Sequence, residues 1–226
     1  MGLDLYAKVE PLLGFEEQKN ELYEIFLHKL ASLGIKRFLD IGAGSGTFMQ
    51  RALKRGFRPK GIDISCEMVR RARQQGLDVA CKDICDVDDR FEAAVAVFDV
   101  INYLSFPELQ RFFACVRNVL DDGGYFLCDI NTLYGFSEIA QGTLVVDNDR
   151  ECVAIDANFA DNRLQTDIIY FYNESGCYKK EKDSIIQYYH DITDLKRLGL
   201  ELVDIDLVAL FGDEADKALL TWQKGK

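Results

Sequence analysis

A glycine-rich loop between a short apolar segment and a helical segment constrains the fold of this chain more than any other feature. Residues 37–41 predict a short buried strand, and the helical spacing of apolar residues resumes at Thr47. Gly42, Gly44 and Gly46 stand between the two. Glycine is needed where a backbone turns sharply and lies against a ligand with no Cβ in the way. The loop therefore indicates a ligand-binding turn, although a purely structural turn between strand and helix stays open.

An acidic residue at the end of the next predicted strand strengthens the ligand-binding interpretation. Asp63 follows Gly42 by 21 residues, near the end of the predicted strand 60–64. In a doubly wound sheet, the carboxyl ends of these strands face one crevice. A carboxylate there can accept hydrogen bonds from both hydroxyls of a ribose, whereas an isolated Asp at such a place is also typical of a helix cap. Together, the loop and Asp63 predict a cofactor that contains a nucleoside.

The spacing of the loop distinguishes between kinds of nucleoside cofactor. Nicotinamide and flavin sites usually have G-x-G-x-x-G, in which the helix start holds a pyrophosphate. Here the third glycine comes one residue early, and Asp40 precedes the loop within the strand. An acidic residue there would repel a pyrophosphate, but it suits the α-ammonium group of a methionine moiety, directly or through water. The pattern therefore favours S-adenosylmethionine.

The order of the predicted elements indicates the fold class. Strands and helices alternate up to residue 130, which predicts a parallel sheet with right-handed crossovers. The predicted helices cover 16–33, 47–55, 65–75 and 107–120, and the predicted strands cover 37–41, 60–64, 77–81, 93–100 and 125–130. After about Gly142, strands separated by turns are predicted at 143–147, 151–159, 163–173 and 178–189. A short helix at 191–198 and strands near 200–209 and 216–223 are expected to return to the main sheet.

The expected fold is therefore α/β, a doubly wound Rossmann-like seven-stranded sheet with an antiparallel β insertion after the fifth strand. We expect residues 1–142 and 190–226 to form the cofactor-binding domain. Residues 143–189 are expected to form the insertion, which would cover the substrate side.

Four short motifs make about residues 35–131 similar to the class I S-adenosylmethionine-dependent methyltransferases. Phe38–Phe48 resembles the first motif of that family, Asp63 its acidic ribose ligand, and Asp83 its adenine-contacting acidic residue. Segments 98–104 and 116–131 are similar to its fourth- and fifth-strand regions. The resemblance implies methyltransferase activity with S-adenosylmethionine as the cofactor. The cofactor contacts that we expect on this basis are Asp40, Gly42, Ala43, Gly44, Gly46, Asp63, Ile64, Met68, Asp83, Ile84 and Phe98.

The antiparallel insertion looks like the substrate-covering sheet of a subgroup that includes aminosugar N-methyltransferases. Members often carry a His-x-Gln-Arg-like stretch near the end of that sheet. Residues 184–190 match this stretch at Gln187 and lack its basic residue. The resemblance implies methyl transfer to a nitrogen or oxygen atom of a small-molecule acceptor, and it does not name the acceptor.

Polar residues after the predicted fourth and fifth strands and at the end of the insertion are the candidates for the acceptor side. Displacement at a sulfonium mainly needs positioning and desolvation, so a neutral amine acceptor requires no strong base. The catalytic candidates are Asn102, Tyr103, Asn131, Tyr134 and His190. Core packing explains the two tyrosines equally well, and capping of a helix near Asp191 is the alternative for His190. By the resemblance, Tyr6 belongs to an N-terminal lid over the cofactor, with a frayed terminus as the alternative.

Charge and cysteine content narrow the expected partners and environment. The chain has 27 Lys and Arg against 38 Asp and Glu, a net charge of −11, which argues against a nucleic-acid partner. The seven cysteines match no zinc pattern, so we expect no metal site, free thiols and a reducing compartment. With no visible signal peptide and no apolar stretch of membrane-spanning length, a cytoplasmic protein without membrane contact is expected. Strand pairing through the insertion would form a homodimer.

Two other functions remain open on the sequence. One is an NAD-dependent oxidoreductase on a similar sheet, which is disfavoured by the early third glycine and by the lack of a Tyr-x-x-x-Lys-like pair. The other is a non-catalytic cofactor-binding protein of the same fold, which the weak match at 184–190 leaves open.

Overall fold

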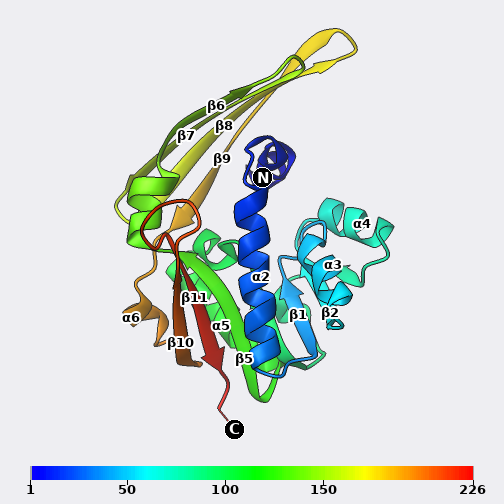
Figure 1. The fold of residues 1–226 in the computed structure, drawn as a ribbon, viewed down its shortest axis with the longest axis vertical. Helices are drawn as coiled ribbons and strands as arrows, with labels where there is room; N and C mark the ends of the chain where they lie inside the picture. The colour runs from blue at the N-terminus through cyan, green and yellow to red at the C-terminus, as the bar shows by residue number, and fades with distance from the viewer. Residues whose placement is uncertain (1, 226) are drawn as a thin grey trace.

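The centre of the molecule is a seven-stranded sheet with the order β10-β11-β5-β4-β1-β2-β3 (Figure 1). The computed structural model describes residues 2–225. The strands are β1 (Arg37–Ile41), β2 (Arg58–Asp63), β3 (Val79–Cys81), β4 (Phe91–Ala96), β5 (Leu120–Asn131), β10 (Glu201–Val208) and β11 (Lys217–Gln223). β1 to β5 pair in parallel, whereas β11 runs antiparallel to both β5 and β10. The expected doubly wound fold is confirmed, and the carboxyl ends of β1 to β5 lie at one edge of the sheet.

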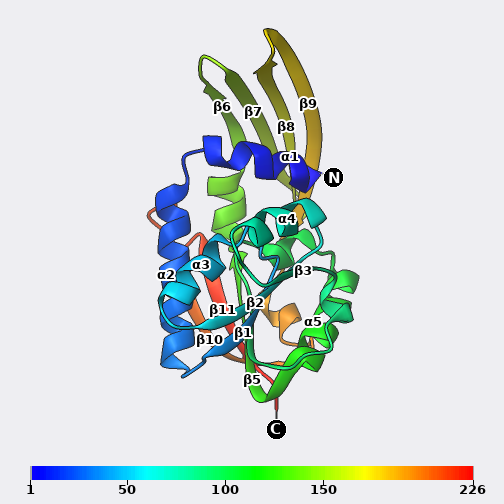
Figure 2. The same ribbon diagram turned by 90° about the vertical axis from the view of Figure 1, so that its right-hand side faces the viewer.

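Helices cover both faces of this sheet (Figure 2). They are α2 (Glu16–Ser32), α3 (Thr47–Lys54), α4 (Cys66–Gln74), α5 (Phe106–Val119) and α6 (Ile192–Leu195). Phe26 of α2 and Phe48 of α3 pack with Phe38 of β1 in the core of one face. Phe113 of α5 packs edge to face on Trp222 of β11 in the core of the other face, with ring centroids 5.3 Å apart. Burying both faces with apolar side chains is what allows parallel strands of nearly continuous apolar sequence.

Local signals explain where two of these helices begin. α5 starts with a capping box in which Ser105 and Glu108 satisfy each other's backbone N–H groups, and Pro107 lies in its first turn. The hydroxyl of Ser65 accepts a hydrogen bond from the backbone N–H of Met68 and caps α4. These two helices therefore start where the sequence predicts.

A second sheet of order β6-β7-β8-β9 projects beyond the main sheet (Figures 1 and 2). Its strands are β6 (Gly142–Asp147), β7 (Glu151–Ala160), β8 (Arg163–Glu174) and β9 (Cys177–Tyr188). All neighbouring strands of this sheet pair antiparallel. The expected antiparallel insertion after the fifth strand is thus present, and it follows the π-helical turn η4 (Gly135–Ala140).

The N-terminal helix α1 (Gly2–Val9) lies against the insertion, and the 3-10 turn η1 (Glu10–Leu12) follows it. Leu5 and Val9 pack with Val153 and Ile168 of the insertion. Figure 2 shows α1 below the strands of the insertion and above α4. Helix α1 therefore lies between the insertion and helix α4 of the main domain.

Three details differ from the sequence prediction. β4 ends at Ala96 rather than at residue 100, because Phe98 and Asp99 have left-handed backbones with φ of 66° and 58°. The turn η3 (Val100–Tyr103) follows them, and a further turn, η2 (Ile84–Asp86), follows β3. The helix expected at 191–198 is confined to Ile192–Leu195. None of the helices in residues 2–225 is long and apolar enough to cross a membrane.

Candidate active site

The glycine loop joins β1 to α3 at the carboxyl edge of the sheet. Gly42, Gly44 and Gly46 all have left-handed backbones, with φ of 75°, 54° and 87°. A Cβ on Gly46 would lie 2.1 Å from the side chain of Leu77, so this glycine permits close packing at the start of α3. A Cβ on Gly44 would meet no heavy atom within 4 Å. The loop therefore has one glycine for internal packing and one whose open side can face a ligand.

Asp63 lies beside this open side of the loop. One of its carboxylate oxygens accepts a hydrogen bond from the N–H of Gly44 at 2.8 Å, and the other accepts from the N–H of Ser65 at 2.7 Å. These two bonds hold the carboxylate between the glycine loop and the start of α4. The side chain is only partly buried, so its oxygens can also accept hydrogen bonds from ribose hydroxyls.

Asp40, which directly precedes the loop, is the polar group that most needs a ligand. Its side chain is 2% exposed, and its Oδ2 is buried with no hydrogen-bond partner among the described residues. Burial and the neighbouring Asp63 raise the pKa of Asp40 to about 8. A buried, unsatisfied carboxyl oxygen is costly unless something partners it. The orphaned oxygen and the open side of Gly44 therefore fit the α-ammonium and methionine portion of S-adenosylmethionine.

The remaining expected cofactor contacts extend along the same edge of the sheet. Asp83 follows β3, where its carboxylate accepts a hydrogen bond from the N–H of Cys85 at 2.8 Å and pairs with Arg111 at 3.3 Å. Ile64 is an apolar side chain left 64% exposed beside Asp63. The exposed apolar surface of Ile64 suits the face of an adenine ring, and the carboxylate of Asp83 suits its polar edge. The others are Gly42, Met68 and Phe98, which are exposed or partly exposed, and Ala43 and Ile84, which are buried.

Four cysteines form two disulfides beside these residues, which corrects the expectation of free thiols. Cys66 at the start of α4 is bonded to Cys81 at the end of β3, and Cys85 in η2 is bonded to Cys115 in α5. The partners are 15 and 30 residues apart in sequence. They meet because β2 pairs with β3 and because η2 packs on α5, contacts that cysteine spacing does not reveal. Cys81 and Cys85, the closest pair in the sequence, do not bond to each other.

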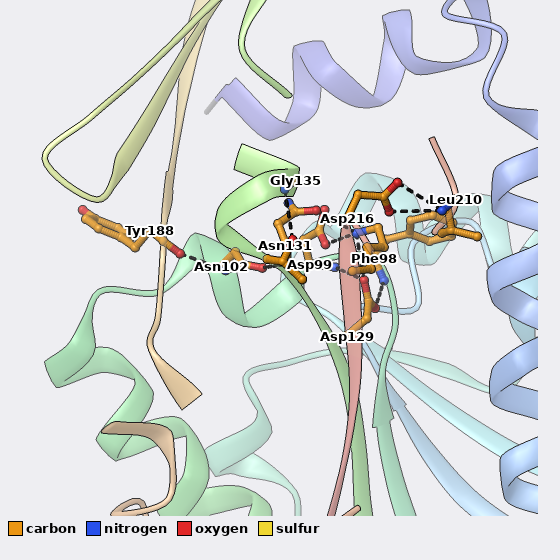
Figure 3. Close-up of polar contacts among 11 residues, drawn as sticks. Phe98, Asp99, Asn102, Asp129, Asn131, Gly135, Tyr188, Leu210 and Asp216 are labelled. Carbon is orange, nitrogen blue, oxygen red and sulfur yellow. Dashed lines mark hydrogen bonds and ion pairs between the residues drawn. The ribbon is translucent and has the colours of Figure 1, made fainter. Parts of the chain in front are cut away.

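Two of the acceptor-side candidates, Asn102 and Asn131, are joined to each other (Figure 3). Asn102 in η3 is fully buried, and its amide donates to the carbonyl of Tyr188 at 2.8 Å. Its side-chain oxygen accepts from the N–H of Asn131 at 3.1 Å. The side chain of Asn102 thus links the ends of β5 and β9.

Tyr103 lies in the same turn as Asn102 and shares its surroundings with Tyr6 of α1. Burial raises the pKa of Tyr103 well above its usual value, with smaller contributions from Tyr6 and Asp99. Burial raises the pKa of Tyr6 to about 12, with contributions from Glu10 and Asp99. Both phenols are therefore protonated at neutral pH, and the charge of Asp99 acts on both.

Of the other two acceptor-side candidates, Tyr134 lies at a different loop, whereas His190 contacts the turn that carries Asn102 and Tyr103. Tyr134 packs on the loop between β10 and β11, where a Cβ on Gly212 would lie 3.0 Å from the Tyr134 hydroxyl. That loop is shaped by Asp216, whose carboxylate accepts hydrogen bonds from the N–H groups of Leu210 (Figure 3), Phe211 and Gly212. His190 is buried, and its Nε2 donates to the carbonyl of Leu104 at 3.0 Å.

The alternative that His190 caps the following helix is wrong. Asp191 is the N-cap of α6, and its carboxylate accepts from the N–H of Thr193 at 2.7 Å. Burial lowers the pKa of His190, so its ring is neutral at neutral pH.

A buried ionic cluster at the ends of β4, β5 and β11 was missed by the sequence analysis. The ammonium of Lys217 contacts the carboxylates of Asp99 and of Asp129, the latter at 3.0 Å, and the side-chain oxygen of Asn131 at 3.1 Å. The sequence contained two signals of this cluster. Lys217 stands at the start of an otherwise apolar strand, and Asp99 stands within the apolar run 93–100. Neither signal names the partner, because 118 residues separate Lys217 from Asp99.

Comparisons with known proteins give this arrangement its context. The model of a methyltransferase domain matches residues 38–124. A protein described as a "putative methyltransferase" in Geobacillus sp. (strain WCH70) is 24% identical over 197 residues, which cover 80% of each chain. The structure of an S-adenosylmethionine-dependent methyltransferase from Clostridium acetobutylicum has a TM-score of 0.80 at 21% identity, over 99% of this chain and 98% of that one. The sugar N-methyltransferase KedS8 from Streptoalloteichus sp. has a TM-score of 0.74 at 16% identity, over 99% and 93%.

The matched domain contains the glycine loop, Asp40, Asp63 and Asp83, the residues on which the resemblance rests. The match to a methyltransferase domain favours an S-adenosylmethionine site over the nicotinamide-dependent alternative. Residues 38–124 therefore match a methyltransferase domain, and the whole chain has the fold of S-adenosylmethionine-dependent methyltransferase structures.

Proposed function

We propose that this protein transfers the methyl group of S-adenosylmethionine to a nitrogen or oxygen atom of a small-molecule acceptor. The observation that carries the proposal is the cradle made by the open side of Gly44, the Asp63 carboxylate and the unpartnered oxygen of Asp40. S-adenosylmethionine supplies a methyl group on a sulfonium, from which a well-placed nucleophile can displace it. The protein's own contribution is positioning and the exclusion of water.

Each part of the cradle has a role in this proposal. Asp40 partners the α-ammonium group, Asp63 accepts hydrogen bonds from the ribose hydroxyls, and Asp83 faces the adenine edge. Gly42, Ala43, Gly44 and Gly46 let the backbone approach the cofactor. Ile64, Met68, Ile84 and Phe98 provide the apolar walls.

The acceptor site in this proposal lies over the carboxyl ends of β4 and β5, under α1 and the insertion. The electrostatic influence of Tyr6 on the buried Tyr103 supports a lid role for α1. Asn102, Asn131 and His190 hold the floor of the site in place through bonds within the protein. Tyr134 lies at its margin. In this scheme the insertion, residues 143–189, covers the substrate side of a cofactor-binding domain made of 1–142 and 190–226.

Binding of S-adenosylhomocysteine measured by calorimetry tests the cofactor assignment. We expect a micromolar Kd and no binding of NAD. Asp63→Ala should raise the Kd by at least about tenfold, because charge-assisted hydrogen bonds are lost. Asp78→Ala, which removes an exposed carboxylate just before β3, is the matched control and should bind normally. Tight NAD binding without S-adenosylhomocysteine binding would refute the proposal.

We further propose that two copies pair through β6, the edge strand of the insertion. The strand is almost wholly exposed, and Leu144 and Val145 are 39% and 59% exposed. An edge strand of this kind can pair with a second copy. Light scattering after size exclusion should show a dimer, and Val145→Lys should convert it to a monomer. A wild-type monomer at high concentration would exclude the pairing.

A cytoplasmic location is also proposed. In a reducing compartment the two disulfides are expected to open. Alkylation of thiols in freshly lysed cells, followed by mass spectrometry, tests the reducing location and the opening of the disulfides together. All four cysteines should be alkylated.

A further inference from the structure

The cluster of Lys217, Asp99 and Asp129 presents one group to the acceptor side. Lys217 has three N–H donors, and three acceptors take them: Asp99, Asp129 and Asn131. The side chains of Lys217 and Asp129 are 3% and 1% exposed, whereas that of Asp99 is 17% exposed. The most exposed charge of this cluster is therefore the carboxylate of Asp99, which follows the carboxyl end of β4.

The backbone around Asp99 is held in an uncommon conformation that keeps this carboxylate in place. Phe98 and Asp99 are successive non-glycine residues with left-handed φ angles. The carboxylate of Asp129 accepts hydrogen bonds from both of their N–H groups, at 2.7 and 3.2 Å (Figure 3). Strain of this kind persists only where the surroundings over-determine it, and it concentrates at functional sites. The Asp129 carboxylate thus holds the backbone of Asp99 in place and pairs with Lys217, the lysine that Asp99 also contacts.

The charge of Asp99 acts on two phenols, and the one cation that acts on either of them, Lys217, is already paired within the protein. The neighbouring hydroxyls of Tyr6 and Tyr103 are protonated, and the charged groups acting on them are Glu10, Asp99, Asp129 and Lys217. The donors of Lys217 are all used within the protein. Lys8, the basic residue of α1, is tied to Glu181 at 2.6 Å. Such surroundings are complementary to an amine and unfavourable to a carboxylate or a phosphate.

We propose that Asp99 binds the reacting amino group of the acceptor, so that the substrates of this enzyme are amines. The inference rests on the proposed function and specifies its substrate class. The carboxylate accepts a hydrogen bond from the neutral amine and aligns its lone pair. The nitrogen forms a bond to the methyl carbon as the carbon–sulfur bond breaks and its electron pair goes to sulfur. The proton that leaves the methylated nitrogen passes to Asp99 and then to solvent. Lys217 and Asp129 are positioning residues.

The test compares three probes with one ring and different polar groups: cyclohexylamine, cyclohexanol and cyclohexanecarboxylate. Their binding to protein saturated with S-adenosylhomocysteine is measured by saturation-transfer NMR. We expect cyclohexylamine to bind about tenfold more tightly than cyclohexanol, with no signal from the acid. Asp99→Asn, which can still accept from Lys217, should abolish this preference. Asp149→Asn, at an exposed turn of the insertion, should leave it unchanged.

Three outcomes would overturn the inference: no preference for the amine in the wild type, the same preference in Asp99→Asn, or no signal from any ring. Calorimetry separates this failure from failure of the proposed function. If the wild type does not bind S-adenosylhomocysteine, the cofactor assignment fails. If a folded Asp99→Asn protein loses that binding, Asp99 serves the cofactor and the inference is wrong. Should Asp99→Asn not fold, Asp99→Glu keeps the charge and must retain the preference for the amine.

Discussion

The side-chain amide of Asn102 donates a 2.8 Å hydrogen bond to the main-chain carbonyl of Tyr188, the last residue of β9. Its side-chain oxygen accepts from the N–H of Asn131, the last residue of β5. One fully buried side chain therefore connects the end of the main sheet to the end of the insertion. This bond anchors the end of β9 at the carboxyl edge of the main sheet.

Asn102→Ala should loosen this connection. It leaves the carbonyl of Tyr188 and the N–H of Asn131 without partners, at about 1–3 kcal/mol for each buried group. Urea unfolding should show a loss of about 2–4 kcal/mol, and proteolysis of the insertion should become faster. Asn158→Ala, at an exposed position of β7, should change stability by less than about 0.5 kcal/mol. Equal effects of the two substitutions would contradict the connecting role.

Gly44→Ala should separate the effect of a ligand from that of backbone strain. Gly44 and Gly56 both have left-handed φ angles, and a Cβ at either position meets no heavy atom within 4 Å. Each Ala substitution should cost about 1 kcal/mol of stability. Only Gly44→Ala should also weaken binding of S-adenosylhomocysteine in calorimetry. Normal binding by Gly44→Ala would show that the open side of the loop does not face the cofactor.

Cofactor affinity should depend on pH through Asp40. Burial and Asp63 raise the pKa of this carboxyl to about 8, and binding of an ammonium group favours its ionised form. Affinity for S-adenosylhomocysteine should therefore rise by roughly tenfold from about pH 6.5 to about pH 8, with proton release detected by calorimetry in buffers of different ionisation enthalpy.

The stability of the unliganded protein should change in the opposite direction with pH. Between the unfolded pKa and the raised folded pKa, the folded state keeps a proton on Asp40 that the unfolded chain has lost. This contribution to stability is lost as pH rises through about 8. Asp40→Asn should flatten both profiles, and a pH dependence that survives the substitution must come from another group.

Lys217→Met should destabilise the protein strongly. It leaves the carboxylates of Asp99 and Asp129 without their common cation, which should cost about 3–5 kcal/mol in chemical unfolding. Adding Asp99→Asn should recover part of this loss. Lys29→Met is the matched control, since Lys29 also pairs with two carboxylates, Asp204 and Asp206, which are 53% and 43% exposed. That substitution should cost less than about 1 kcal/mol.

Removal of the disulfide in Cys85→Ser, Cys115→Ser should lower stability by about 3 kcal/mol, because the unfolded chain gains freedom. Thermal unfolding should shift by roughly 6–12 °C. Binding of S-adenosylhomocysteine should also weaken, since the N–H of Cys85 holds Asp83. Dithiothreitol, which also opens Cys66–Cys81, should destabilise the wild type at least as much, and Cys177→Ser, which removes an exposed free thiol, should not. An unchanged melting temperature after verified reduction would contradict the stabilising role.

The sequence alone determined the order of the elements and the cofactor edge of the site. Periodicity of apolar residues is local, so most helices and strands from α2 to β11 could be predicted within a few residues. β5 is an exception, because it begins at Leu120 instead of residue 125. The glycine loop, Asp40 and Asp63 could be recognised because one strand–loop–helix unit and the end of the neighbouring strand supply them. The early end of β4 could not be predicted, because Asp129, 31 residues from Phe98, holds the left-handed turn.

Only the tertiary structure decided which residues meet on the acceptor side. Antiparallel pairing of β11 with β5 places Lys217 opposite Asn131, and parallel pairing of β4 with β5 brings Asp99 to the same point. The same kind of long-range contact joins the disulfide partners and engages both ends of the Asn102 side chain. No local sequence pattern predicts these long-range contacts, because they depend on the order and direction of strands in the sheet.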